Sequence, residues 1–391
     1  MLAGIWLVNV CIGLSMFCMA PLVSVVAADL NLSLVAMGSV LGAWPLLYML
    51  VALPLGAVVD RIGLRRCVTL GAWIVTLSVL LRGQAQGYAS LYLAVALLGL
   101  GVPLISISTP KLVNYWFPPG ERGTATGFYM SGPSVGAMLG LALTNLVVMP
   151  AVGHQWRMVM LVYALMTAIA ASAWWVVAYR LGPRGPSDRE PGRAMQWAQY
   201  LRLLERPSAR RVLLLATGSF LFMHGLSNWI PEILRSAGMN AASAGLWAAL
   251  PVAITVLGAI LVPRVTPPGR RARMLILLFL LAAVAALLLT ASGFGWTVLG
   301  LILLGVARSA FWPLTLLCLT EAQDMQRSEL APAGALFFTF GELGGVLGPL
   351  IIGALAQVSG SFVLPLVALA GLCLALALVS LSLERLQRAG A

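Results

Sequence analysis

Twelve stretches of about 20 apolar residues run along this chain, each long enough to cross a bilayer as a helix. Of the 391 residues, 61% are hydrophobic and only 9% are charged, whereas a soluble domain carries about 25% charged residues. Polar groups cannot cover the surface of such a chain, so it must face lipid. We therefore expect an all-α membrane protein with twelve transmembrane helices. The expected spans are 4–27, 34–59, 67–85, 91–117, 123–149, 157–179, 211–233, 243–262, 274–292, 295–319, 332–357 and 361–383.

The basic residues are distributed unevenly over the loops between these spans. With the N-terminus in the cytoplasm, nineteen of the 24 Lys and Arg residues fall in cytoplasmic segments. The other side holds only Arg82, Arg157 and Arg235, and Lys111 and Arg308 lie within spans. The positive-inside rule therefore predicts a multi-pass protein of a bacterial-type cytoplasmic (inner) membrane, with both termini in the cytoplasm. The net charge of +12 then reflects topology, and we expect no nucleic-acid partner.

Several other classes of protein are excluded by what the chain lacks. The five cysteines lie in or beside spans, and their spacing fits neither a disulfide framework nor a metal site. The two histidines, His154 and His224, are far apart and form no cluster with a nucleophile, which argues against an enzyme. No Gly-rich loop with a lysine indicates ATP binding. We expect no cofactor and no metal. A non-transporting sensor is the remaining alternative from another class, but no extra soluble domain is visible.

One long polar segment, 181–210, divides the chain into two predicted six-helix bundles, 1–180 and 211–391. Its start is rich in Gly, Pro and Arg and reads as a flexible cytoplasmic linker. Its later part, from Ala194 to Glu205, has the spacing of a short amphipathic helix, which we expect on the inner membrane surface. The two halves repeat weakly, because the segment from Gly127 to Gly136 matches that from Leu336 to Gly345 at an offset of 209.

A short polar run, Gly56-Ala-Val-Val-Asp60-Arg61-Ile-Gly63-Leu-Arg65-Arg66, interrupts the apolar sequence after the second span. It closely resembles the loop between the second and third helices of the major facilitator superfamily, although Leu64 stands where the family often has a basic residue. The resemblance implies two pseudo-symmetric bundles with a solute site between them near mid-membrane, working by alternating access. It also implies a cytoplasmic gate in which Asp60 forms a latch and the glycines let helices approach closely. The gate residues would be Gly56, Asp60, Arg61, Gly63, Arg65 and Arg66.

Other motifs support the same family. The run from Trp116 to Gly127 is similar to the loop before the fifth helix of this superfamily. Gly132-Pro133-Ser-Val-Gly136 resembles part of the antiporter motif of that helix, though we favour simple helix packing through small residues. The run from Asn228 to Leu234, Asn-Trp-Ile-Pro-Glu-Ile-Leu, resembles the cyanate and nitroimidazole transporter group. The Asn-Leu-Arg-Pro signature of that group is absent from the first span.

Two ionisable residues are predicted near the middle of the membrane. Arg308 lies twelve residues into the tenth span, where a charge costs at least about 2.5–3.5 kcal/mol unless it faces a cavity or a partner. It is a candidate for gripping an anionic solute through its planar guanidinium, or for a structural ion pair. Trp312 is expected one turn further on the same face. Glu342, ten residues into the eleventh span, is a candidate proton-coupling site or a counter-charge to Arg308.

Further polar and aromatic residues are candidates for the walls of a solute cavity. His224 and Asn228 lie one turn apart in the seventh span, where either solute contact or ordinary interhelical hydrogen bonding is expected. Lys111 follows Pro110 in the fourth span and either snorkels to the inner interface or joins the anion path. Tyr48 and Tyr129 stand near mid-depth and are candidates for solute contact.

These residues together predict a secondary active transporter for a small organic or inorganic anion, such as an organic carboxylate or a cyanate-like ion. Proton symport is the expected coupling, and the protein is expected to be a monomer in contact with lipid. The alternative within the transport class is a proton-driven exporter of lipophilic drugs, which the glycines of the fifth span and the many aromatic residues favour.

Overall fold

The computed structural model describes residues 1–181, 197–322, 324–325 and 329–389, and these residues form helices and turns without a strand. They include twelve helical segments long and apolar enough to cross a membrane, which confirms the predicted fold. The predicted limits are close to the observed ones: the fourth segment is Tyr88–Trp116 against an expected 91–117, and the eleventh is Pro332–Ser359 against 332–357.

The helices gather into two compact units. The N-unit comprises Met1–Ala194 and Asn240–Ala249, and the C-unit comprises Met195–Met239 and Leu250–Ala391. Helix α12 (Ala241–Val265) therefore gives its first residues to the N-unit and the rest to the C-unit. The predicted bundle limits, 1–180 and 211–391, remain a prediction.

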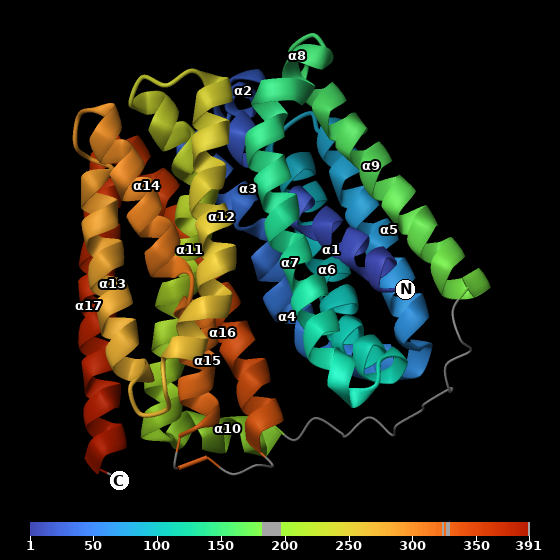
Figure 1. The fold of residues 1–391 in the computed structure, drawn as a ribbon. Helices are drawn as coiled ribbons and strands as arrows, with labels where there is room; N and C mark the ends of the chain where they lie inside the picture. Colours follow the sequence, from blue (N-terminus) through green and yellow to red (C-terminus); the bar gives the residue numbers. More distant parts are fainter. Residues whose placement is uncertain (182–196, 323, 326–328, 390–391) are drawn as a thin grey trace. The chain divides into compact units, whose positions relative to one another are not determined.

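Figure 1 traces the helices in chain order. Those of the N-unit are α1 (Leu2–Phe17), α2 (Val23–Asp29), α3 (Leu34–Leu41), α4 (Ala43–Ile62), α5 (Leu64–Gly83), α6 (Tyr88–Trp116), α7 (Pro119–Leu143), α8 (Met149–Ala151) and α9 (Trp156–Val176). Those of the C-unit are α10 (Trp197–Glu205), α11 (Pro207–Ser236), α13 (Arg271–Leu288), α14 (Phe294–Arg308), α15 (Phe311–Thr320), α16 (Leu330–Ser359) and α17 (Val363–Ala389).

Helix α10 falls within the predicted amphipathic segment. Its Leu203 is buried in the C-unit, while Leu201 is 63% exposed, which leaves an apolar side chain available to lipid. Most of the predicted linker, residues 182–196, lies outside the described part of the chain.

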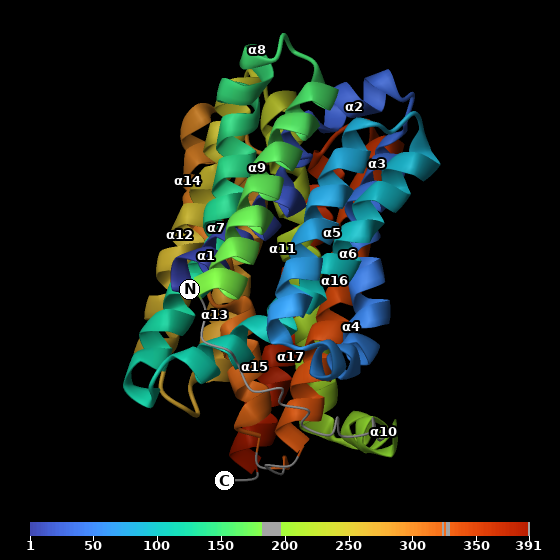
Figure 2. The same cartoon turned by 90° about the vertical axis from the view of Figure 1, so that its right-hand side faces the viewer.

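Glycines bring helices into backbone contact in each unit, most closely α1 with α7 and α11 with α16. In the N-unit a Cβ atom on Gly136 of α7 would lie 1.9 Å from the carbonyl oxygen of Val10 in α1. In the C-unit a Cβ atom on Gly344 of α16 would lie 1.9 Å from that of Thr217 in α11. Figures 1 and 2 show these pairs side by side. The favoured reading of the Gly132–Gly136 motif, close helix packing through small residues, is confirmed.

The same contacts set the register of the internal repeat. Gly136 is matched by Gly344 and Gly140 by Gly348, an offset of 208. The sequence match at 209 is therefore displaced by one residue. At either offset Gly136 is matched by a glycine, because α16 carries two adjacent ones, Gly344 and Gly345. Only the packing shows which glycine faces the neighbouring helix.

Several spans are interrupted, among them the first and the tenth. In the first, α1 ends at Phe17 and a 3₁₀ turn, Ala20–Leu22, precedes α2. In the tenth, α14 ends at Arg308 and α15 begins at Phe311. Pro313 accounts for the second break, because it has no N–H and its ring excludes the carbonyl four residues earlier, that of Ser309. Arg308 therefore ends a half-helix, where the last carbonyl groups lack helical partners and favour a cation.

Candidate functional site

Arg308 is the strongest candidate for a functional side chain in the C-unit. It is only 5% exposed, and its Nε and Nη1 atoms are buried without a hydrogen-bond partner. The ion pairs of the described residues all use other arginines. Buried charges are normally paired, since burying an isolated one is costly. Arg308 therefore holds donors that an anionic group is suited to fill.

Glu342 is also buried, but it does not pair with Arg308. Its residue is 6% exposed, its Oε2 atom has no hydrogen-bond partner, and none of the ion pairs among the described residues involves it. The packing gives the reason: α16 packs chiefly against α11 and α17, whereas α14 packs chiefly against α13. The expected role of Glu342 as a fixed counter-charge to Arg308 is therefore not observed.

His224 lies on α11, which meets the start of α15, three residues after Arg308, through Phe222 and Phe311. The His224 ring stacks on Phe220 at a centroid distance of 5.8 Å. One turn later, the Asn228 amide nitrogen donates to the His224 carbonyl oxygen at 2.8 Å. The Asn228 Oδ1 atom is buried without a hydrogen-bond partner. The predicted one-turn relation of His224 and Asn228 is thus present.

Trp312 does not follow Arg308 on a continuous helix as expected. The helix break at Ser309 and Ala310 separates them, and the aromatic partner of Trp312 is Phe338 of α16, at a centroid distance of 6.4 Å. No cation–π contact joins Trp312 to Arg308 within the described residues. The expectation failed because it assumed an unbroken helix through Pro313.

The remaining cavity candidates belong to the N-unit. Lys111 is exposed on α6, and Tyr129 of α7 is 7% exposed. Tyr48 is half-buried on α4 and meets Trp44 edge-on at 6.5 Å. A Cβ atom on Gly99 would lie 2.2 Å from the Trp44 carbonyl oxygen, so this part of α4 packs directly on α6.

Comparison with known proteins identifies the family. The sequence profile of the Major Facilitator Superfamily matches residues 5–326. The chain belongs to this superfamily. It is accordingly a multi-pass membrane transporter and not an enzyme. The fold agrees with a bacterial homologue of the human lysosomal transporter Spinster in an inward-facing, occupied conformation, with a TM-score of 0.72 and 17% identity. That match covers 99% of this chain and 95% of the other.

Several bacterial transporters are similar over most of their length. A probable galactarate/D-glucarate transporter of Bacillus subtilis is 25% identical, covering 85% of this chain and 80% of the relative. A D-galactonate transporter of Escherichia coli is 25% identical, covering 82% and 80%. A quinolone resistance transporter of Acinetobacter baumannii is 27% identical, covering 85% and 81%.

The loop motif of this superfamily member holds several helices of the N-unit together. Gly63 joins α4 to α5 with a φ of +93°, a left-handed conformation that glycine tolerates best. Nothing lies within 4 Å of a Cβ built on Gly56 or Gly63, so the close helix approach implied for them is not observed in this unit. The Arg65 Nη1 atom donates to the Ala178 carbonyl oxygen at 3.1 Å, and its guanidinium lies 5.9 Å from the Trp116 ring centroid.

Arg61 and Arg66 of the motif are exposed, and the side chain of Asp60 lies outside the described part of the chain. The motif resembling the cyanate group has a structural component, because buried Trp229 donates from Nε1 to the Pro349 carbonyl oxygen at 2.9 Å.

Arg82 is a buried residue that sequence reasoning misplaced. It was expected on the outer surface but is 1% exposed inside the N-unit. Its Nη1 atom donates to the Ser15 carbonyl oxygen at 2.6 Å and its Nη2 atom to the Ser78 hydroxyl at 3.1 Å. Ser15 lies in the last turn of α1, so Arg82 satisfies a carbonyl group at the break in the first span. Its position near the end of an apolar run gave no signal of this partner.

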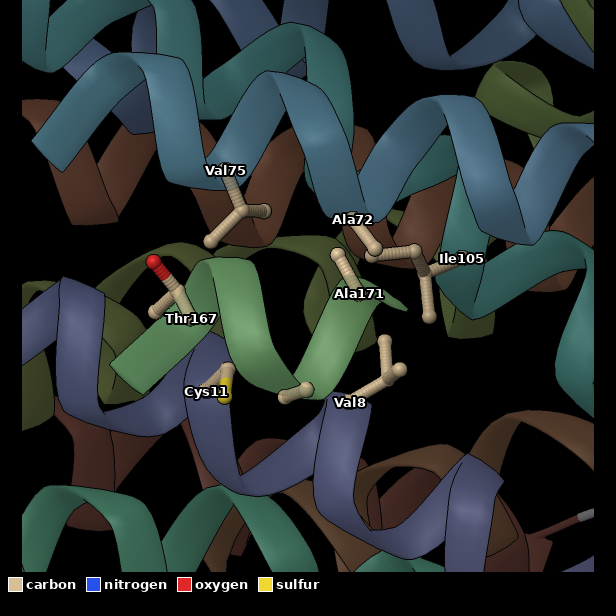
Figure 3. Close-up of a pocket in the computed structure, with 8 residues that line it drawn as sticks. Val8, Cys11, Ala72, Val75, Ile105, Thr167 and Ala171 are labelled. Atoms are coloured by element: carbon tan, nitrogen blue, oxygen red, sulfur yellow. The ribbon is translucent and has the colours of Figure 1, made fainter. Parts of the chain in front are cut away.

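A small pocket between α1, α5, α6 and α9 lies apart from all these candidates (Figure 3). Its walls are almost entirely apolar, with one threonine hydroxyl and one thiol among them. The lining residues are Val8, Cys11, Ala72, Val75, Ile105, Thr167, Ala170 and Ala171. With no charged side chain, it is unsuited to an anion.

Proposed function

We propose that this protein is a secondary active transporter that moves a small organic or inorganic anion by alternating access, coupled to protons. The observation that carries the proposal is the buried guanidinium of Arg308, with two nitrogen atoms that lack hydrogen-bond partners. Guanidinium binds carboxylates through two parallel hydrogen bonds, so an organic carboxylate fits these atoms well. The relatives named for galactarate/D-glucarate and D-galactonate support the same class of solute.

Proton coupling is assigned to Glu342. Because it makes no ion pair with Arg308, its carboxyl group is available to bind and release a proton as access alternates. A proton carried with a monovalent anion leaves net charge unchanged. We expect Glu342→Gln to keep anion binding but to lose accumulation driven by an inward proton gradient in proteoliposomes. Accumulation that persists in this variant would remove Glu342 from the coupling step.

Other residues have supporting roles in the proposal. In the C-unit, the proposed solute-contacting residues besides Arg308 are His224, Asn228 and Trp312. In the N-unit they are Lys111, Tyr48 and Tyr129. The loop motif acts as the cytoplasmic gate, with Asp60 as the latch and Arg65 holding the loop to the segment Val177–Leu181, just after α9, through the Ala178 carbonyl group.

The decisive experiment measures thermal stabilisation of the purified protein by small anions and by lipophilic cations. We expect carboxylates to raise the unfolding temperature, and Arg308→Ala to abolish this effect. The matched control is Arg235→Ala, which removes an arginine that is ion-paired with Glu232 at 3.2 Å near the end of α11. Anion stabilisation equal in Arg308→Ala and the control would overturn the proposal.

A second candidate function is the export of lipophilic compounds. The quinolone resistance relative favours it, as do the aromatic contacts of Phe220, Phe337, Phe338 and Trp312 in the C-unit. This candidate predicts stabilisation by lipophilic cations that does not depend on Arg308. The same thermal experiment therefore separates the two functions.

A further inference from the structure

Asn228 offers a solute a hydrogen-bond acceptor, in addition to the positive charge of Arg308. The residue is 1% exposed, and its amide nitrogen donates to the His224 carbonyl oxygen. A carbonyl oxygen only accepts, so the nitrogen must be the amide atom that faces it. The orientation of the amide is therefore fixed, and Oδ1 points away from that bond. This oxygen is buried and has no hydrogen-bond partner.

The position of Asn228 relates it to the anion-binding residue. Helix α11 meets the start of α15, three residues after Arg308, through the rings of Phe222 and Phe311 at a centroid distance of 5.9 Å. Asn228 lies on the same helix α11. An extended acid held by Arg308 can therefore reach along α11 toward Asn228.

The polar atoms without hydrogen-bond partners differ in kind between Arg308 and Asn228. Arg308 offers donors, which suit a carboxylate. Asn228 Oδ1 is an acceptor, which a carboxylate cannot satisfy but a hydroxyl group can. A plain carboxylate or an inorganic anion would leave this oxygen unsatisfied, and an unsatisfied buried acceptor is costly. A solute with both an anionic group and a hydroxyl group would satisfy the unpaired atoms of both residues.

We infer that Asn228 is a specificity-determining residue that selects hydroxylated carboxylic acids over acids of equal length without hydroxyl groups. The inference rests on the proposed function, because it assumes that Arg308 receives the carboxylate. A site that hydrogen-bonds a hydroxyl group discriminates strongly against analogues that lack it, since its own polar atom is then left unpaired.

The test compares D-glucarate with adipate, which has the same six-carbon diacid chain and no hydroxyl groups. Dissociation constants are measured on the purified full-length protein by calorimetry. We expect D-glucarate to bind at least about tenfold more tightly, as one recovered hydrogen bond implies. Asn228→Leu should weaken D-glucarate binding by about the same factor and leave adipate binding unchanged. The comparison in the unaltered protein needs no variant, so it stands even if Asn228→Leu fails to fold.

The N-unit supplies a matched control in Asn9. This asparagine is 6% exposed and donates to the carbonyl oxygen of Ile5, one turn earlier in α1, at 2.9 Å. Asn9→Leu should keep the preference for D-glucarate. Loss of the preference in both variants would show that the effect is not specific to Asn228 and would overturn the inference.

The outcomes separate this inference from the proposed function. If both acids bind equally and both lose binding in Arg308→Ala, the anion transporter stands and the selective role of Asn228 is wrong. If neither acid binds and Arg308→Ala changes nothing for any anion, the proposed function fails and the inference fails with it.

Discussion

The two deeply buried arginines differ in what fills their hydrogen-bonding capacity. Arg82 gives both Nη atoms to the Ser15 carbonyl oxygen and the Ser78 hydroxyl within the N-unit, and only its Nε atom is buried without a hydrogen-bond partner. Arg308 leaves Nε and Nη1 without such partners in the C-unit. The contacts of Arg82 are typical of a structural residue, whereas the unpaired donors of Arg308 are typical of a ligand-binding residue. We assign only Arg308 to the solute on this basis.

The structural role of Arg82 predicts a loss of stability on substitution. Arg82→Ala removes a buried side chain and leaves the Ser15 carbonyl oxygen without this donor, which costs about 1–3 kcal/mol for the unpaired group alone. We expect a clearly lower unfolding temperature in detergent. The control is Arg235→Ala, which lies in the last turn of α11 as Arg82 does in α5. Its partly exposed ion pair contributes about 0–1 kcal/mol. Equal unfolding temperatures for the two variants would contradict the structural role.

The sequence predicts which segment each charged residue belongs to, but it does not predict whether the side chain is buried or which partner it meets. Arg82 and Arg235 both follow apolar runs, and both were expected on the outer side. One is buried and the other is partly exposed, because the break in the first span brings an unsatisfied carbonyl group to Arg82 alone. A partner 67 residues away leaves no local pattern in the sequence.

At the scale of elements, close helix contact in both units depends on glycines. Gly344→Ala would place a methyl group against the Thr217 carbonyl oxygen and force α16 away from α11. Overpacking of this kind costs about 1–3 kcal/mol. Gly334→Ala is the control in the same helix, because nothing lies within 4 Å of its Cβ position. It should be neutral or stabilise by up to about 1 kcal/mol through helix propensity.

The repeat predicts the same pair of outcomes in the N-unit. Gly136→Ala in α7 should destabilise by its contact with the Val10 carbonyl oxygen, while Gly127→Ala in the same helix meets nothing within 4 Å. Unfolding temperatures of the four variants test both units together. Stability retained in Gly136→Ala or Gly344→Ala would show that the helices separate without cost at these points.

Elements were predictable where a long apolar run ends at charged or turn-forming residues. The span Tyr88–Trp116 is of this kind, and its limits were expected closely. The breaks after Phe17 and Arg308 were not expected, since the residues on both sides remain apolar and the run continues in composition. Pro313 was the available signal for the second break, and it was also the reason that Trp312 could not share a helical face with Arg308.

At the scale of the whole molecule, the uneven charge of the loops predicts the orientation in the membrane. The outer side is expected to hold three arginines. Arg157 pairs with Asp29 at 2.5 Å, Arg235 pairs with Glu232, and Arg82 is buried. Each therefore has a local structural function that explains its departure from the rule. Many basic residues of the other side need no such explanation, because the cytoplasmic face attracts them.

The orientation is testable by cysteine labelling, since all five native cysteines are buried. Gln155→Cys places a thiol at an exposed position between the fifth and sixth spans, and Arg202→Cys places one at an exposed position on α10. A membrane-impermeant maleimide should label Gln155→Cys in intact cells. It should label Arg202→Cys only in inverted vesicles. The protein without added cysteines is the control for background labelling.

Labelling in the reverse pattern would place both termini outside and would also change the direction of the proposed gate. The loop with Asp60 and Arg65 would then face the exterior and could not be a cytoplasmic gate. The anion site itself is independent of this result, because Arg308 lies within a span and keeps its unfilled donors in either orientation. The labelling pattern therefore tests the orientation in the membrane without testing the solute, and the binding measurements test the solute without testing the orientation.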